Sequence, residues 1–277
     1  MRTLIDFSRR YGADPALVIA GGGNTSMKEN GVLYIKASGE ALASVSADSF
    51  VALDLAALLA ILEKRYPLSD EEREAAFLAD VQAAALPGQA DKRASVETLL
   101  HALFPQRYVL HLHPTLINGL TCSAEGARAA ARLFPSALWV PECRPGYTLA
   151  RLLADRLSPE RHTVLLQNHG VFFAADDAGT LDRLLKHMLD TLGGEVSGAE
   201  NAEPPYPALE EPFTPDQIVY CGAGPELPEG ENARALYEDA RKIAAFAGFF
   251  GGPRPMSREL ISFIVGWEAE SYRKSRA

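Results

Sequence analysis

Short apolar runs divide the chain into buried segments, and their periods predict the elements. Runs rich in branched or aromatic residues and bounded by turn residues predict strands, while apolar residues at a helical period predict helices. The predicted strands cover residues 17–20, 32–36, 108–113, 137–140, 163–167 and 171–174. A further strand within 46–62 leads into a helix that starts near Asp54. The other predicted helices cover residues 1–11, 70–85, 95–103, 116–120, 123–134, 149–157, 177–192, 230–249 and 257–274.

A proline-rich segment separates the last two helices from the rest. Residues 193–215 contain two adjacent glycines and five prolines, a composition typical of a linker or a wrapping loop. We therefore divide the chain into residues 1–200 and a linker with a helical extension, residues 201–277, packed on the same domain. In the final helix, Leu260, Ile264, Trp267 and Ser271 form one stripe at helical spacing, which favours packing over a cofactor site.

Two histidines lie on the predicted strand 108–113. His111 and His113 are two residues apart, so both side chains leave the same face of the strand. Two imidazoles on one face suit a divalent transition metal such as zinc, although a hydrogen-bonded structural pair has the same pattern. A third histidine, His169, follows the apolar strand 163–167 and precedes a glycine that permits a sharp turn.

Two turns of small residues suit an anion. Residues 21–26 read Gly-Gly-Gly-Asn-Thr-Ser, and residues 37–39 read Ala-Ser-Gly. Backbone and hydroxyl donors in such turns can hold a phosphate, whereas a plain tight turn is the simpler interpretation. The first turn matches neither a dinucleotide fingerprint nor a P-loop, because the required spacing and the Gly-Lys ending are absent.

Glu97 lies near the start of the predicted helix 95–103, with Ser95 as its expected N-cap. A carboxylate in the first turn suits the helix dipole, and His101 follows four residues later on the same face. A structural role therefore explains Glu97 as well as a catalytic one on this pattern alone.

Composition narrows the class of partner. The formal net charge is −9 and the pI is about 5.2, which argues against nucleic acid but not against a small anion bound by local donors. The three cysteines lack metal-binding or disulfide spacing, the first residues lack the apolar run of a signal peptide, and no stretch is long enough to span a membrane. We therefore expect a cytoplasmic protein with no membrane partner.

These pieces together predict chemistry next to a carbonyl. A catalytic zinc commonly keeps three protein ligands and one open position, which His111, His113 and His169 could supply. The metal would polarise the carbonyl oxygen, and the Glu97 carboxylate would remove or return a proton.

The ordered set of motifs resembles the class II aldolase/adducin family, which includes fuculose-phosphate and rhamnulose-phosphate aldolases. The resemblance covers roughly residues 5–190. The matching pieces are Gly23-Asn24-Thr25-Ser26, Ala37-Ser38-Gly39, Ser95-Val96-Glu97, His111-Leu112-His113 and Asn168-His169-Gly170. The tail, with residues 213–216 and 267–272, is similar to the aldolase half of longer proteins in which the aldolase is fused to a short-chain dehydrogenase.

The resemblance implies an α/β fold, with three α/β/α layers around a mostly antiparallel sheet. It also implies one zinc ion per chain and commonly a homotetramer with sites at subunit interfaces. By residue, it implies that the metal ligands are His111, His113 and His169, that the catalytic acid/base is Glu97, and that the substrate phosphate is held by Asn24, Ser38, Gly39 and Ser95.

Two positions depart from the family pattern. Val96 replaces a second small hydroxyl residue before the glutamate, so phosphate contact is weakened or the substrate is different. Glu142 stands where a tyrosine can assist catalysis in some members, and it is either a substitute acid or a solvated loop residue.

The leading hypothesis is a zinc-dependent aldolase that reversibly cleaves a ketose 1-phosphate to dihydroxyacetone phosphate and an aldehyde. A sugar-phosphate epimerase or a decarboxylase on the same scaffold is one alternative, although epimerase relatives tend to have aspartate in place of Glu97. A non-catalytic adducin-like module is the other, although such modules lack the metal ligands.

Overall fold

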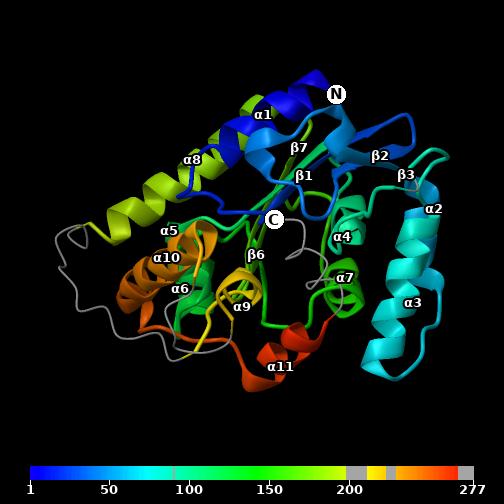
Figure 1. Cartoon of the computed structure of the whole chain (residues 1–277). Coiled ribbons are helices and arrows are strands. Elements are labelled where there is room, and N and C mark those ends of the chain that lie inside the picture. The colour runs from blue at the N-terminus through cyan, green and yellow to red at the C-terminus, as the bar shows by residue number, and fades with distance from the viewer. Residues whose placement is uncertain (90, 198–210, 223–228, 268–277) are drawn as a thin grey trace.

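A mostly antiparallel sheet of seven strands, with helices on both faces, forms the centre of the molecule (Figure 1). The computed structural model describes residues 1–89, 91–197, 211–222 and 229–267. The strands lie in the order β3-β2-β1-β4-β7-β6-β5, and only the β5–β6 pair is parallel. The three-layer α/β fold expected from the sequence is therefore confirmed.

The seven strands occupy the first two thirds of the chain. Their bounds are β1 Asn24–Glu29, β2 Val32–Lys36, β3 Phe50–Asp54, β4 Tyr108–Leu112, β5 Leu138–Val140, β6 Thr163–Leu166 and β7 Gly170–Ala175. Strand β4 is fully buried between β1 and β7, so it is central in both sequence and space.

Each face of the sheet carries its own apolar core. One core contains Phe7, Ile117 and Leu185, and its helices are α1 (Arg2–Gly12), α5 (Thr115–Thr121), α6 (Gly126–Leu133) and α8 (Ala178–Glu195). The other core surrounds Phe77 and Phe172, and its helices are α2 (Leu55–Ala60), α3 (Asp70–Ala83), α4 (Thr98–Leu103) and α7 (Tyr147–Ala154). The alternation of side chains along each strand supplies both cores at once.

The helices vary from one turn to five. The α-helices are α1 Arg2–Gly12, α2 Leu55–Ala60, α3 Asp70–Ala83, α4 Thr98–Leu103, α5 Thr115–Thr121, α6 Gly126–Leu133, α7 Tyr147–Ala154, α8 Ala178–Glu195, α9 Pro215–Cys221, α10 Glu231–Ala247 and α11 Arg258–Gly266. Single 3-10 turns are η1 Leu42–Ser44, η2 Ala47–Ser49, η3 Ile61–Glu63 and η5 Gly248–Phe250. Within the described residues, no helix is both long enough and apolar enough to cross a membrane.

The predicted strand at residues 17–20 is wrong. These residues form turns in which the backbone NH groups of Leu17 and Val18 both donate to Asp14 O. The first strand instead begins at Asn24, inside the segment expected to be a turn. Pairing explains the shift, because Asn24 is the register partner of His111 on β4, and strand pairing outweighs the apolar content of residues 17–20.

The extension contains one helix that the sequence analysis missed. Helix α9 begins after Thr214 with Pro215 at its first position, where proline is favoured. The composition of residues 193–215 predicts only a linker up to this proline and no helix after it. Helix α10 packs against α5 and α9, and Figure 1 shows the three side by side. Residues 198–210 of the predicted linker, and residues 268–274 of the final predicted helix with Ser271, lie outside the described residues.

Candidate metal centre and active site

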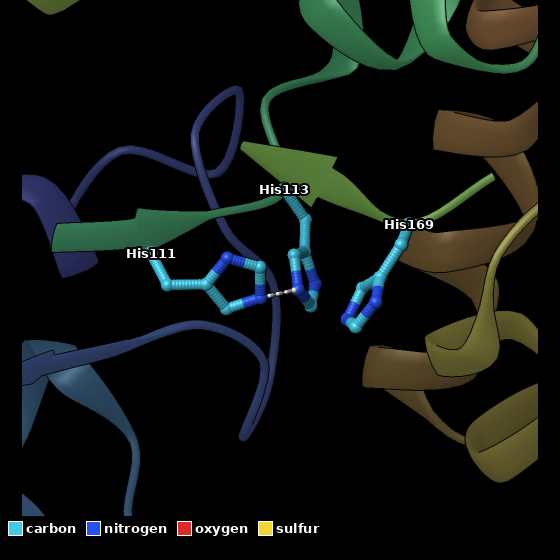
Figure 2. Close-up of side chains that lie close together, drawn as sticks. All are labelled: His111, His113 and His169. Atoms are coloured by element: carbon cyan, nitrogen blue, oxygen red, sulfur yellow. Dashed lines mark hydrogen bonds between the residues drawn. The ribbon is translucent and has the colours of Figure 1, made fainter. Parts of the chain in front are cut away.

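Three histidines, from the end of β4 and from the β6–β7 turn, converge at one end of the sheet. His111 lies in β4 and His113 directly follows it, while His169 lies in the turn between β6 and β7. One ligand nitrogen from each ring lies within 4.8 Å of the others, and Figure 2 shows the rings close together. The group of imidazoles that the sequence predicted is therefore brought together and could hold a divalent metal ion.

The local backbone of the third histidine explains the Asn-His-Gly sequence. Asn168 adopts a left-handed conformation, with φ of 56°, which asparagine tolerates better than most residues. A Cβ atom on Gly170 would lie 2.5 Å from Leu112 O and 2.7 Å from Cδ2 of His113. Only glycine therefore allows β7 to begin so close to the two histidines of β4.

Hydrogen bonds on the far side of two rings define which nitrogen faces the site. His111 Nδ1 lies 3.1 Å from Val171 O, and His113 Nδ1 lies 2.5 Å from Oδ2 of Asp216. Because a carbonyl and a carboxylate accept, both Nδ1 atoms donate, and the lone pairs are on the two Nε2 atoms.

The donor set fits a cation. The Nε2 atoms of His111 and His113 are 2.9 Å apart, and two lone pairs repel at that distance unless a positive charge lies beside them. Glu97 Oε1 is buried, accepts no hydrogen bond of good geometry, and lies 3.1 Å from Nε2 of His111 and 3.2 Å from Nε2 of His169. Three imidazole nitrogens and a carboxylate oxygen are ligands that zinc accepts.

The protonation states also suit a metal centre. Burial disfavours ionisation of Glu97, but the neighbouring rings of His111 and His169 hold its pKa well below the usual range. Burial lowers the pKa of His111 to about 4. Near neutral pH the site therefore contains a charged carboxylate and a neutral imidazole at His111, the forms that bind metals.

Glu97 lies just before helix α4 rather than inside it. The helix begins at Thr98, so the prediction that Ser95 caps a helix starting at 95 is wrong. Ser95 instead forms a tight turn, in which its Oγ accepts from Glu97 N at 3.3 Å and its carbonyl accepts from Thr98 N at 3.0 Å. This turn aims the Glu97 carboxylate into the site instead of along the helix surface.

Asn24 connects the first strand to Glu97. Its Nδ2 donates to Oε2 of Glu97 at 2.5 Å and to Oγ of Ser95 at 3.2 Å. Its Oδ1 accepts from Nε2 of His101, whose Nδ1 accepts from Oγ of Ser26 at 2.7 Å. The expected pairing of Glu97 with His101 is thus indirect, with the amide of Asn24 between them.

The predicted phosphate residues line one pocket beside the histidines. Its lining comes from both predicted anion turns, the Glu97 turn, His169, a proline of the loop before α7 and the proline that begins α9. The lining residues are Gly21, Gly23, Asn24, Lys36, Ala37, Ser38, Gly39, Ser95, Val96, Glu97, Pro145, His169 and Pro215. Asn24, Ser38, Gly39 and Ser95 are therefore neighbours of the metal group in space as well as in the motif order.

Lys36 is a pocket residue that sequence reasoning missed. Its side chain is buried, and its ammonium group donates to Glu40 O at 2.5 Å. The sequence feature that could have identified Lys36 is its position at the end of an alternating strand, immediately before the Ala-Ser-Gly turn. A lysine there adds the positive charge that the small-residue turns lack.

Glu142 has a structural partner. Its carboxylate accepts from the backbone N of Ser257 at 3.0 and 3.3 Å, where Ser257 is the N-cap of α11. The neighbouring Arg144 forms an ion pair with Glu259 at 2.5 Å. This loop therefore fastens the start of α11 to the body of the protein.

Comparisons with known proteins agree with this geometry. Residues 2–191 match the family model of the class II aldolase and adducin N-terminal domain. A protein of Bacillus subtilis (strain 168) named uncharacterized oxidoreductase YuxG is 33% identical over 180 residues, which are 61% of this chain and 25% of the relative. The match therefore spans only a quarter of that relative's length.

Two solved structures share the fold. The N-terminal class II aldolase domain of a conserved protein from Thermoplasma acidophilum gives a TM-score of 0.61 at 25% identity, covering 69% of this chain and 91% of that one. An L-fuculose 1-phosphate aldolase gives a TM-score of 0.50 at 16% identity, covering 73% of this chain and 87% of that one.

Proposed function

Since the chain belongs to the class II aldolase and adducin family, we propose that it is a zinc-dependent aldolase. It reversibly cleaves a ketose 1-phosphate to dihydroxyacetone phosphate and an aldehyde. The observation that carries this proposal is the convergence of three imidazoles and the Glu97 carboxylate beside a pocket that is lined by Glu97, His169 and the anion-suited turns.

The roles of the residues follow from their positions. His111, His113 and His169 hold the metal, which when bound supplies a Lewis acid for the carbonyl and hydroxyl oxygens of the substrate. Glu97 accepts a proton from the substrate and returns it, since its carboxylate is charged, buried and next to the ligand nitrogens. Asn24 holds that carboxylate in place through Oε2, leaving Oε1 toward the histidines.

We place the phosphate of the substrate in this pocket, against the small-residue turns. Ser38, Gly39 and Ser95 offer hydroxyl and backbone groups, and Gly39 has a φ of 83°, a conformation that favours glycine. Lys36 lies in the same lining, and its positive charge would compensate the negative charge of the bound phosphate.

The proposal extends to assembly and partners. We propose a homotetramer that acts on a small phosphorylated sugar, with neither nucleic acid nor membrane as a partner. The net charge of −9 supports the exclusion of nucleic acid, because phosphate backbones require a basic surface. Size-exclusion chromatography with light scattering tests the tetramer.

A panel of ketose 1-phosphates tests the reaction. Each compound is incubated with the protein, with and without a chelator, and dihydroxyacetone phosphate is detected by a coupled assay. The expected result is cleavage of one member that the chelator abolishes and added zinc restores. Conversion to an isomer without cleavage, detected by NMR, would favour an epimerase, and no reaction with zinc present would contradict the aldolase proposal.

A further inference from the structure

The C-terminal extension reaches the metal centre through one buried side chain. Asp216, on helix α9, is 2% exposed, and its Oδ2 lies 2.5 Å from Nδ1 of His113. His113 is one of the three grouped histidines, whereas Asp216 lies beyond residues 2–191, the part that matches the family domain. A residue outside the family domain is therefore in direct contact with a ligand inside it.

The segment that carries Asp216 is fixed firmly. Every residue from 212 to 219 is buried. The side-chain oxygen of Gln217 accepts from the backbone N atoms of Phe213, at 2.6 Å, and Thr214, at 3.0 Å. Asn168, the neighbour of His169, donates from Nδ2 to Phe213 O at 3.1 Å. The carboxylate of Asp216 is thus held in position relative to two of the three histidines.

The glycine turn leaves room for this carboxylate. A Cβ atom on Gly22 would lie 2.5 Å from Oδ2 of Asp216 and 3.2 Å from Nδ1 of His113. Gly21 and Gly23 line the pocket, whereas Gly22 packs against the Asp216–His113 pair. One of the three glycines is therefore required by the extension and not by an anion in the pocket.

The extension has a second buried carboxylate, which binds a threonine hydroxyl instead of a histidine. Asp239, on α10, accepts from the hydroxyl of Thr115 at the start of α5. Burial raises the pKa of Asp239 to about 6. Among the described residues, Asp239 makes no hydrogen bond to a histidine, although its charge is near enough to His113 to interact with it. It therefore provides a matched comparison for Asp216, with a nearby carboxylate but no hydrogen bond to the ring.

We propose that Asp216 is a positioning residue of the metal centre, and that through it the C-terminal extension sets the affinity of the site for a divalent cation. This inference rests on the metal site of the proposed function. Accepting the Nδ1 proton fixes the His113 ring and its tautomer, so Nε2 always presents a lone pair to the metal. The negative charge also makes that nitrogen a stronger donor.

Metal affinity measured on the full chain tests the proposal. Kd values for Zn²⁺ and Co²⁺ are obtained by competition with a chromophoric chelator for the wild type and for Asp216→Ala, Asp216→Asn and Asp239→Asn. We expect Asp216→Ala to bind both ions about 10–100-fold more weakly, as losses of such outer carboxylates typically do. Asp216→Asn keeps the shape and one acceptor oxygen, so its Kd should fall between those of the wild type and Asp216→Ala.

The control and a spectrum separate positioning from a general structural role. Asp239→Asn should bind both ions within about twofold of the wild type, since its partner is Thr115 and not a ligand. The visible absorption of the Co²⁺ form should change in the Asp216 variants and not in Asp239→Asn. If Asp216→Ala fails to fold, Asp216→Asn decides alone, with about tenfold weaker binding expected.

The possible failures are distinguishable. If the Asp216 variants have the same Kd values and the same Co²⁺ spectra as the wild type, the proposed role of Asp216 is wrong. The aldolase proposal would not be affected by that result. If Asp216→Asn and Asp239→Asn weaken metal binding equally, the proposed role of Asp216 is also wrong. The loss of affinity would then come from changed packing of the C-terminal extension. A wild-type protein that binds neither ion would instead remove the metal site itself, and with it the proposed function.

Discussion

The side-chain amide of Asn24 donates a 2.5 Å hydrogen bond to Oε2 of Glu97. Asn24 is also the register partner of His111 across the β1–β4 pair. The β1–β4 pairing therefore places one proposed metal ligand opposite the residue whose amide holds the proposed base. Asn24 also lines the pocket, so its predicted contact with phosphate stays a prediction beside its bond to the carboxylate.

This relationship predicts that Asn24→Ala impairs the chemical step. A hydrogen bond to a charged group contributes about 1.5–3 kcal/mol, so we expect kcat for retro-aldol cleavage to fall about tenfold or more. Steady-state kinetics on the best substrate of the panel measure it. Ser38→Ala is the control. Because Ser38 lines the pocket, this substitution should raise KM with little change in kcat. A raised KM with unchanged kcat in Asn24→Ala would limit Asn24 to substrate binding.

The buried ammonium of Lys36 predicts a charge-dependent KM. Lys36→Met should raise KM for a phosphorylated ketose about tenfold or more, because a charged hydrogen bond to the phosphate is lost. Lys28→Met removes a half-buried lysine on β1, whose Nζ donates to Gln106 O at 3.1 Å, and should leave KM unchanged. Equal changes in both variants would show that loss of a lysine, and not the pocket charge, causes the effect.

Metal removal should lower thermal stability. A ligand at 100 times its Kd stabilises the native state by about 2.7 kcal/mol. For a chain of this size that corresponds to a fall in Tm of about 5–10 °C when the metal is removed. Differential scanning fluorimetry with and without chelator measures the shift, and His111→Ala should show no such shift. An identical Tm for the wild type in both conditions would speak against a resident metal.

Buried His101 predicts a pH dependence of stability. Burial lowers the pKa of His101 well below its ordinary value of 6.5, so the native state leaves it neutral while the unfolded state takes up a proton. The free energy of unfolding should therefore decrease as pH falls from 7 through 6.5 toward 5. Urea unfolding at pH 7 and 5 measures the decrease, which His101→Gln should reduce and His187→Gln, at an exposed position of α8, should leave unchanged.

Local patterns in the sequence predicted most of the elements. Val32–Lys36 was predicted with its observed bounds, because an alternating run between turns has few other conformations. Helix α2 begins next to Asp54 as expected, and the structure adds that Asp54 caps it by accepting from Ala57 N at 2.9 Å. The spacing of His111 and His113 placed both rings on one face because a strand has a fixed period of two.

Features that depend on tertiary contacts were missed. Residues 17–20 are apolar enough for a strand, but β1 pairs with β4 from Asn24 onward. Asp216 lies 103 residues from His113, and no local pattern reveals that its helix folds back onto the sheet end. In the sequence, Gly22 likewise looks like any glycine of a turn. Its close contact with Asp216 is visible only in the folded structure.

The central claim is that Glu97 is the proton-transferring group of a metal-dependent lyase. Its most direct test compares the retro-aldol rate of the wild type with that of Glu97→Gln, which keeps the size of the side chain and removes its charge. Both proteins are loaded with one equivalent of zinc and assayed on the same ketose 1-phosphate. The account predicts a fall in kcat of about a hundredfold or more with metal still bound. A rate within a few-fold of wild type would contradict it.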